Sequence, residues 1–304
     1  MHCSKPLRAY QFGAGKPVFS PPLRHGSRSF EVPCGRCAGC RLERSRQDAV
    51  RCMHESQMHG ENCFATFTYR PKDLPADLSL VPEHFTLFMK RFRERLRKPS
   101  GEAEPTPRYY MCGEYGDVHS RPHYHALLFG YSPPDKRFYK CASDGSQLYT
   151  SEFLDSVWQK GQVIVGAVTF ESAAYVARYI MKKELGANVS DAREILDVET
   201  GEITFRAHEY SRRSLKPGLG ASWFAKYRSD VFPHDRVLSR GVKSKVPKYY
   251  DVLLERDSPL YLAELKALRR SKADVKDYEE QVRDRVAGDV VLRARLGLLH
   301  RELE

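Results

Sequence analysis

The apolar positions of this chain follow the periods of strands and helices from about residue 40 onward. Four runs are rich in aromatic and β-branched residues and predict strands: residues 63–69, 108–115, 123–129 and 162–170. Four further segments predict helices from helical spacing or from runs of good helix formers: residues 41–59, 83–97, 151–160 and 171–185. From residue 63 the order is β-α-β-β-α-β-α, which predicts an α+β fold built on an antiparallel split-βαβ, ferredoxin-like sheet.

The remaining segments are more polar. Residues 131–150 are expected to form a polar loop and residues 186–200 a linker. Residues 259–273 and 275–302 carry apolar residues at helical spacing among mixed charges, and they predict a helical hairpin. We therefore expect four parts: a Cys-rich N-terminal arm and helix (1–60), a core (61–190), a basic extension (191–250) and the C-terminal helical extension (251–304).

Charge changes this picture by pointing to a partner. The chain of 304 residues has a net charge of +11, and residues 201–250 hold eleven Lys and Arg against four Asp and Glu. Such a concentration favours a polyanion such as single-stranded DNA. The candidate contacts combine cations with a ring that can stack on bases: Arg212, Arg213, Lys216 and Trp223. A basic loop that simply packs over Trp223 is the alternative.

No apolar run is long enough to span a membrane, and the first residues lack the apolar stretch of a secretory signal, so we expect a cytoplasmic protein. Eight cysteines in a cytoplasmic chain argue against a disulfide framework. Cys34, Cys37 and Cys40 have the spacing of a structural Zn²⁺ site that needs a fourth ligand. Cys52 would lie roughly 18 Å along the helix from Cys40, too far to share an ion. Cys3 is therefore the expected fourth ligand, and His2 is a weaker one. Unligated thiols and an iron–sulfur cluster are the alternatives.

Two short patterns carry candidate chemistry. His123 and His125 are two apart on a predicted strand, so their imidazoles share one face and can bind a metal ion, although such pairs also occur as ordinary sheet residues. Tyr175 and Tyr179 are four apart on a predicted helix and share one of its faces. Lys182 and Lys183 follow within one turn of Tyr179. Partly buried packing is the alternative for the tyrosines.

Together these patterns resemble the HUH endonucleases that initiate rolling-circle DNA replication, in particular the initiators of microviruses of the gokushovirus branch. The Cys-Gly-Arg-Cys-Ala-Gly-Cys run from Cys34 and the Ser-Arg-Arg-Ser-Leu-Lys-Pro-Gly run from Ser211 are also similar to that branch. The resemblance covers roughly residues 30–250. Arg178 departs from the pattern, because a lysine there would give Tyr175 its own Tyr-x-x-Lys.

The resemblance implies an HUH nuclease core that nicks and rejoins single-stranded DNA at a phage origin. Glu114, nine residues before His123 and across the predicted hairpin, is the expected third ligand for Mg²⁺ or Mn²⁺. Asp117 and His119, in the turn, are alternatives. The same ligand types also occur in non-haem iron sites.

In that family a tyrosine attacks the DNA backbone and forms a 5′-phosphotyrosine link, and the free 3′ hydroxyl primes a polymerase. We expect Tyr179 to be the principal nucleophile, with Lys182 and Lys183 assisting, and Tyr175 to be its partner. No ATP-binding Walker motif occurs, so a host helicase and polymerase would be partners. The rival interpretations are an HUH relaxase or transposase and a non-catalytic, zinc-containing single-stranded-DNA-binding protein.

Overall fold

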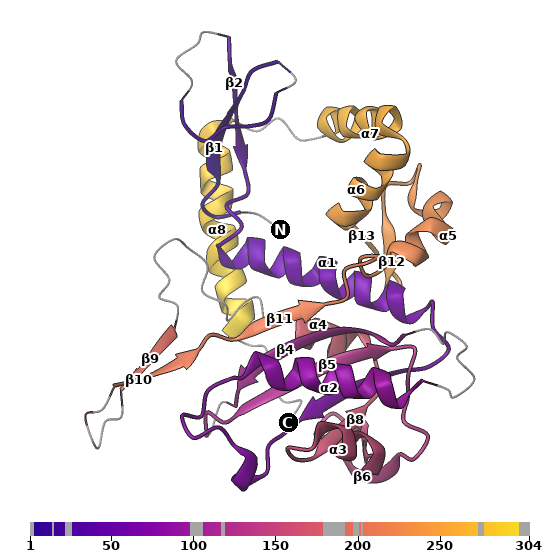
Figure 1. Cartoon of the computed structure of the whole chain (residues 1–304). Helices are drawn as coiled ribbons and strands as arrows, with labels where there is room; N and C mark the ends of the chain where they lie inside the picture. The colour runs from indigo at the N-terminus through magenta and orange to yellow at the C-terminus, as the bar shows by residue number, and fades with distance from the viewer. Residues whose placement is uncertain are drawn as a thin grey trace. The chain divides into compact units, whose positions relative to one another are not determined.

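The computed structural model describes residues 3–13, 15–21, 26–97, 106–116, 119–178, 192–196, 201, 203–272 and 277–297. Within these ranges the chain is an α+β protein with a large antiparallel sheet and eight α-helices (Figure 1). It divides into two compact units. Unit 1 comprises Met1–Arg44 and Arg270–Arg301, and unit 2 comprises Ser45–Arg269 with Glu302–Glu304. The four-part division expected from the sequence stays a prediction.

A seven-stranded antiparallel sheet forms the centre of unit 2 among the described residues, in the order β11-β4-β5-β3-β8-β7-β6. In chain order its strands are β3 (Asn62–Phe67), β4 (Arg108–Tyr115), β5 (Pro122–Phe129), β6 (Arg137–Cys141), β7 (Gln147–Thr150), β8 (Val163–Gly166) and β11 (Tyr210–Arg213). The four strands expected from the sequence are present as β3, β4, β5 and β8. They lie next to one another in the order β4-β5-β3-β8, so two connections cross over a strand.

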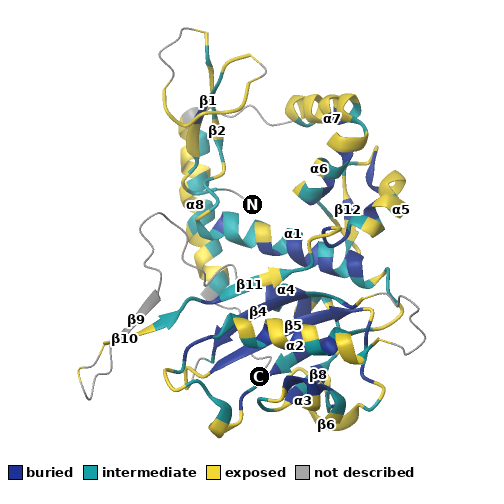
Figure 2. Cartoon of the chain, in the orientation of Figure 1, coloured by how far each residue is buried: buried dark blue, intermediate teal, exposed yellow. Residues whose placement is uncertain are grey.

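Helices cover both faces of this sheet, and the alternation of side chains along β4 and β5 supplies an apolar core to each face (Figure 2). On one face, Met111 and Tyr124 pack with α2 (Pro82–Arg95) and α3 (Glu152–Trp158). On the other face, Leu127 packs with α4 (Phe170–Arg178) and with the unit 2 part of α1 (Ala38–Ser56). Strands buried on both faces hold their register firmly, because a slip of one residue would exchange the two cores.

The helices expected at 41–59, 83–97 and 151–160 are confirmed as α1, α2 and α3. α2 begins with Pro82 in its first turn and buries Phe85, Phe88, Met89 and Phe92 along one stripe. α3 begins at Ser151, whose side-chain oxygen accepts a hydrogen bond from the Leu154 backbone N–H. The helix expected at 171–185 is present as α4 as far as Arg178, and residues 179–185 lie outside the described part of the chain.

Two predictions about loops were wrong. Residues 131–150 contain the hairpin β6–β7 rather than only a loop. Every residue of β6 is exposed at the edge of the sheet, so this strand lacks the half-buried alternation that sequence reasoning relies on. The linker expected at 186–200 contains β9 (Ala192–Leu196), which pairs with β10 (Ile203–Ala207).

The basic segment 201–250 is also structured. It contributes β11 to the main sheet, followed by α5 (Ala221–Val231), the hairpin of β12 (Val237–Ser239) and β13 (Val242–Ser244), and the start of α6 (Lys248–Asp257). With α7 (Pro259–Ser271), these elements build a third apolar cluster around Tyr250 and Phe224.

Unit 1 contains the hairpin of β1 (Leu7–Gln11) and β2 (Arg28–Val32), the beginning of α1, and α8 (Tyr278–Gly297). The predicted helices at 259–273 and 275–302 are present as α7 and α8, and their pairing as a hairpin stays a prediction. In the part of the chain that the structure describes, no helix combines the length and the apolar character that crossing a membrane requires.

Candidate metal and tyrosine site

The central hairpin brings the predicted metal ligands together. β4 and β5 are antiparallel with Glu114 directly opposite His123, and the period of two places His125 on the same face. Nε2 of His123 lies 2.8 Å and Nε2 of His125 2.7 Å from Oε1 of Glu114. All three side chains are buried or nearly so. This convergence is what the sequence predicted for the pair and its carboxylate.

The ring orientations fit a metal ion. Nδ1 of His123 lies 3.1 Å from the Arg121 carbonyl oxygen, which can only accept, so Nδ1 carries the proton. In a neutral ring the Nε2 lone pair then faces the Glu114 carboxylate, and this contact is favourable only with a proton or a cation between them. Nδ1 of His125 is held 2.9 Å from the Thr66 hydroxyl. Such partners on the second ring nitrogen are typical of metal-binding histidines.

The electrostatics keep the carboxylate charged. Burial raises the pKa of the Glu114 carboxyl, but the hydrogen bonds and charges of His123 and His125 outweigh it and bring the pKa to about 2, below the ordinary 4.5. Glu114 therefore remains an anion at any working pH. Two imidazole nitrogens and one carboxylate suit Mg²⁺, Mn²⁺ or another divalent ion, and they leave coordination positions for oxygen ligands.

One of the two candidate tyrosines belongs to this site. The hydroxyl of Tyr175, on α4, donates a hydrogen bond of 2.8 Å to Oε1 of Glu114. Its ring packs edge-on against His125, with centroids 5.0 Å apart. Ala173, Val176 and Ala177 anchor α4 to the sheet face below it, so the packing of the helix aims the phenol at the carboxylate. The predicted site residues that lie outside the described part of the chain are Tyr179, Lys182, Lys183 and the alternative ligand Asp117.

The structure gives the predicted DNA contacts different environments. Lys216 and Arg212 are exposed, and Arg212 donates to the Thr86 hydroxyl. Trp223 stacks on His54 with ring centroids 3.5 Å apart and donates to Gln57 at 2.7 Å, so protein groups cover one of its faces. This packing is the alternative that the sequence had left open.

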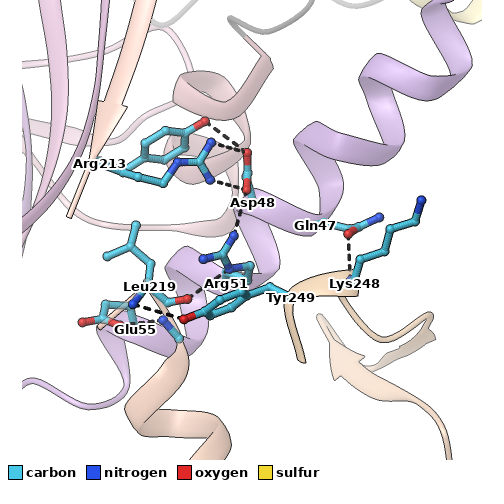
Figure 3. A network of polar contacts seen from close by, with 11 residues as sticks. Gln47, Asp48, Arg51, Glu55, Arg213, Leu219, Lys248 and Tyr249 are labelled. Carbon is cyan, nitrogen blue, oxygen red and sulfur yellow. Dashed lines mark hydrogen bonds and ion pairs between the residues drawn. The ribbon is translucent and has the colours of Figure 1, made fainter. Parts of the chain in front are cut away.

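Arg213 has a structural partner that the sequence did not reveal. Its guanidinium forms two hydrogen bonds to the buried carboxylate of Asp48 on α1, of 2.5 and 2.9 Å, and lies 4.6 Å from the Tyr110 ring centroid (Figure 3). In the same network Arg51 donates to the Leu219 carbonyl oxygen, and the Gly220 N–H donates to Glu55. The network joins α1 to the segment after β11.

The cysteine cluster, by which we mean the side chains of Cys3, Cys34, Cys37 and Cys40, also assembles as expected. Its four sulfur atoms lie within 4.8 Å of one another. Cys52 is instead buried in the core beneath α4, as the length of α1 required.

Comparison with known proteins identifies the family. Residues 62–184 match the family model of the replication-associated protein ORF2. The chain is 34% identical over 291 residues to replication-associated protein VP4 of Bdellovibrio phage phiMH2K, and the match covers 93% of this chain and 88% of the relative. The chain belongs to the gokushovirus-like phage replication-associated proteins. The family resemblance found in the sequence is thereby confirmed.

A second member of the family, replication-associated protein ORF2 of Spiroplasma virus 4, is 28% identical over 304 residues, covering 93% of this chain and 90% of the relative. No solved structure matches the chain. The matched region of the family model spans β3 to α4 and therefore includes Glu114, both histidines and Tyr175.

Two contributors to the site were missed by sequence reasoning. Thr66 lies in a strand whose pairing with β5 had not been assigned, so its place opposite His125 could not be known. The carbonyl group of Arg121 belongs to the backbone and carries no sequence signal at all.

Proposed function

We propose that this protein is a metal-dependent endonuclease that nicks single-stranded DNA at the phage origin and rejoins it, and so starts and terminates rolling-circle replication. The observation that carries the proposal is the convergence of three groups on one carboxylate oxygen. The Nε2 atoms of both histidines and the hydroxyl of Tyr175 lie 2.7–2.8 Å from Oε1 of Glu114. A metal-ligand set and a candidate nucleophile thus occupy the same site.

The fold supports the same assignment. The order β4-β5-β3-β8, with α2 and α3 as crossover connections, agrees with a split-βαβ core of the HUH type. The histidines lie on β5, in the middle of this sheet, and the tyrosine helix packs over them. The names of the relatives, which are replication-associated proteins of phages, favour a role as replication initiator.

The residues of the chain have separable tasks. His123, His125 and Glu114 would hold the divalent ion, which as a Lewis acid would polarise the scissile phosphate. Glu114 fixes the position of the Tyr175 phenol through their hydrogen bond. It is a poor base for that phenol, because a carboxyl with a pKa of about 2 lies roughly eight units below a phenol near 10. We therefore assign Glu114 to orientation and metal binding rather than to proton abstraction.

The reaction needs no external energy. A tyrosine oxygen attacks the phosphorus, a P–O bond to tyrosine forms, and the bond to the 3′ oxygen breaks as that oxygen takes up a proton. The phosphodiester energy is kept in the 5′-phosphotyrosine link, and the new 3′ hydroxyl can prime a host polymerase. A host helicase would open the duplex, in the bacterial cytoplasm where the phage genome is copied.

Two tyrosines on one helix allow termination. After one round, the second tyrosine cuts the regenerated origin while the first still holds DNA. The first link is then attacked by the new 3′ hydroxyl, which closes a circle and frees the first tyrosine. Tyr175 and Tyr179 have the spacing for this exchange. We retain Tyr179 as the principal nucleophile, because Lys182 and Lys183 follow it within one turn.

The experiment is a denaturing gel of the protein incubated with a labelled origin oligonucleotide and Mn²⁺. We expect a covalent protein–DNA adduct that EDTA prevents. Tyr179→Phe should remove most of the adduct on a single-site substrate, whereas Tyr175→Phe should cut once and fail to complete joining. Undiminished adduct in the double variant would reject a tyrosine mechanism.

Two controls complete this test. Tyr139→Phe changes an exposed tyrosine on β6, away from the site, and should leave adduct formation unchanged. His123→Ala should abolish cleavage and keep DNA binding. Full cleavage in excess EDTA would exclude the metal site, and binding without any adduct in the wild-type protein would favour a non-catalytic DNA-binding protein.

A further inference from the structure

The cysteine cluster lies at the open end of the β1–β2 hairpin in unit 1. β1 and β2 pair from Leu7 opposite Val32 to Gln11 opposite Arg28. Cys3 precedes the first strand by four residues, and Cys34 follows the second by two. Cys37 and Cys40 then lead into α1. The cluster therefore joins three points of the chain that the hairpin ladder alone does not hold together.

The local backbone arranges the sulfur atoms as acceptors. The Cys34 N–H donates to Sγ of Cys3 at 3.2 Å, and the Cys37 N–H donates to Sγ of Cys34 at 3.3 Å. The turn between Cys34 and Cys37 contains Gly35 with a φ of +74°, a left-handed conformation that a side chain would strain. It also turns the Arg36 N–H toward Sγ of Cys34, at 3.4 Å. Donors directed at sulfur favour the thiolate form.

The sulfur spacing suits a tetrahedral ion. A Zn–S bond of about 2.3 Å places the corners of a tetrahedron about 3.8 Å apart. Sγ of Cys37 and Sγ of Cys3 are 3.8 Å apart. A disulfide requires about 2.05 Å, so these sulfurs are not arranged as a pair of bridges. The first turn of α1 adds its positive dipole end, since the Arg41 N–H already bonds the Cys37 carbonyl oxygen and Cys40 lies within that turn.

Unit 1 also lacks the usual alternative to a metal, which is an apolar core. Among its described residues Ala9 is the only buried hydrophobic side chain, and none of the three core clusters of the protein draws a residue from this unit. α8 is attached to β2 by an ion pair between Arg285 and Glu31, 2.8 Å long. A two-stranded hairpin is marginal by itself, and such small modules are usually held by a metal or by disulfides.

We propose that the cysteine cluster binds one Zn²⁺ as a tetrathiolate and that this ion holds unit 1 in its folded form. Binding replaces the thiol protons, which pass to solvent, and cross-links the residues before β1 to the turn after β2 and to the first turn of α1. The proposal is independent of the nuclease site, which lies in unit 2.

The test begins with metal analysis of the full-length protein purified without added metal. We expect about one zinc per chain, and exchange with Co²⁺ should give the visible absorption of tetrahedral thiolate coordination. Cys37→Ser and Cys40→Ser should lose the zinc. Cys141→Ser, which changes an exposed cysteine outside the cluster, should keep it, as should His123→Ala in the nuclease site.

A second measurement does not depend on how the variants fold. Stripping zinc from the wild-type protein should make unit 1 sensitive to limited proteolysis and leave unit 2 resistant, and adding Zn²⁺ back should restore protection. A zinc-free preparation with a protease-resistant unit 1 would overturn the proposal. So would iron with the visible colour of an iron–sulfur cluster, a mass showing disulfides, or loss of the zinc in His123→Ala.

Discussion

Replacement of Arg213 by alanine tests whether its guanidinium serves the fold or the DNA. Removing it leaves the Asp48 carboxylate, whose side chain is 6% exposed, with Arg51 at 3.5 Å and the Tyr110 hydroxyl at 3.4 Å. Burial lowers the pKa of Arg213, but its hydrogen bonds to Asp48 outweigh burial and raise the pKa above its ordinary value. The pair is therefore favourable in the folded state.

The expected loss of stability follows from this geometry. Breaking a buried ion pair by removing one partner costs about 3–5 kcal/mol. The side chain of Arg213 is 23% exposed and Arg51 remains near Asp48, so we expect the lower end, about 3 kcal/mol. For a unit of this size that corresponds to a fall of roughly 6–12 °C in Tm.

Intrinsic tryptophan fluorescence during heating is a suitable assay, because both tryptophans of the chain, Trp158 and Trp223, lie in unit 2. Lys216→Ala, an exposed change in the same segment, should stay within about 0.5 kcal/mol of wild type. Adding Asp48→Ala to Arg213→Ala should restore part of the loss, since no buried charge is then left unpaired. An Arg213→Ala protein with wild-type Tm and weakened DNA binding would refute this reasoning and assign the guanidinium to DNA.

Three other predictions concern single side chains. Thr66→Val removes the hydroxyl beside Nδ1 of His125 and should weaken Mn²⁺ binding about 10–100-fold, measured as the Mn²⁺ dependence of nicking; an unchanged dependence would exclude this role. Burial lowers the pKa of His54 from 6.5 to about 4. The folded state therefore prefers the neutral ring, and unit 2 should lose stability as the pH falls from about 6.5 to about 4. His54→Phe, which keeps a ring against Trp223, should flatten that acid loss, and an equal loss in both proteins would contradict the assignment. Lys216→Ala should reduce the slope of log affinity against log salt by up to about 0.7 on single-stranded DNA, and an unchanged slope would move the DNA path elsewhere.

The sequence predicted the nuclease site well because its geometry is local. His123 and His125 are two residues apart, and Glu114 is nine residues from His123 across one hairpin. Strand periodicity and one turn are enough to place three such groups on one face. The cysteine cluster was predictable for a similar reason, since three of its four members lie within seven residues and the length of α1 excluded Cys52.

The failures have the opposite cause. Arg213 was assigned to DNA by its charge alone, because its partner Asp48 is 165 residues away in the sequence. β11 was missed because it joins the sheet beside β4, a pairing that nothing in its own four residues announces. β6 was missed because an exposed edge strand resembles a loop when only burial patterns are available.

The turn before β5 determines whether the nuclease site exists at all. The Arg121 carbonyl oxygen accepts both the Gly116 N–H, at 3.0 Å, and Nδ1–H of His123, at 3.1 Å. One backbone oxygen therefore closes the turn that sets the register of β4 against β5 and fixes the ring nitrogen that faces Glu114. A register shift of one residue would move Glu114 away from His123 and send the histidines to the opposite face. The two apolar cores on either side of the sheet oppose that shift, so the packing of the whole sheet maintains the position of the candidate metal ligands.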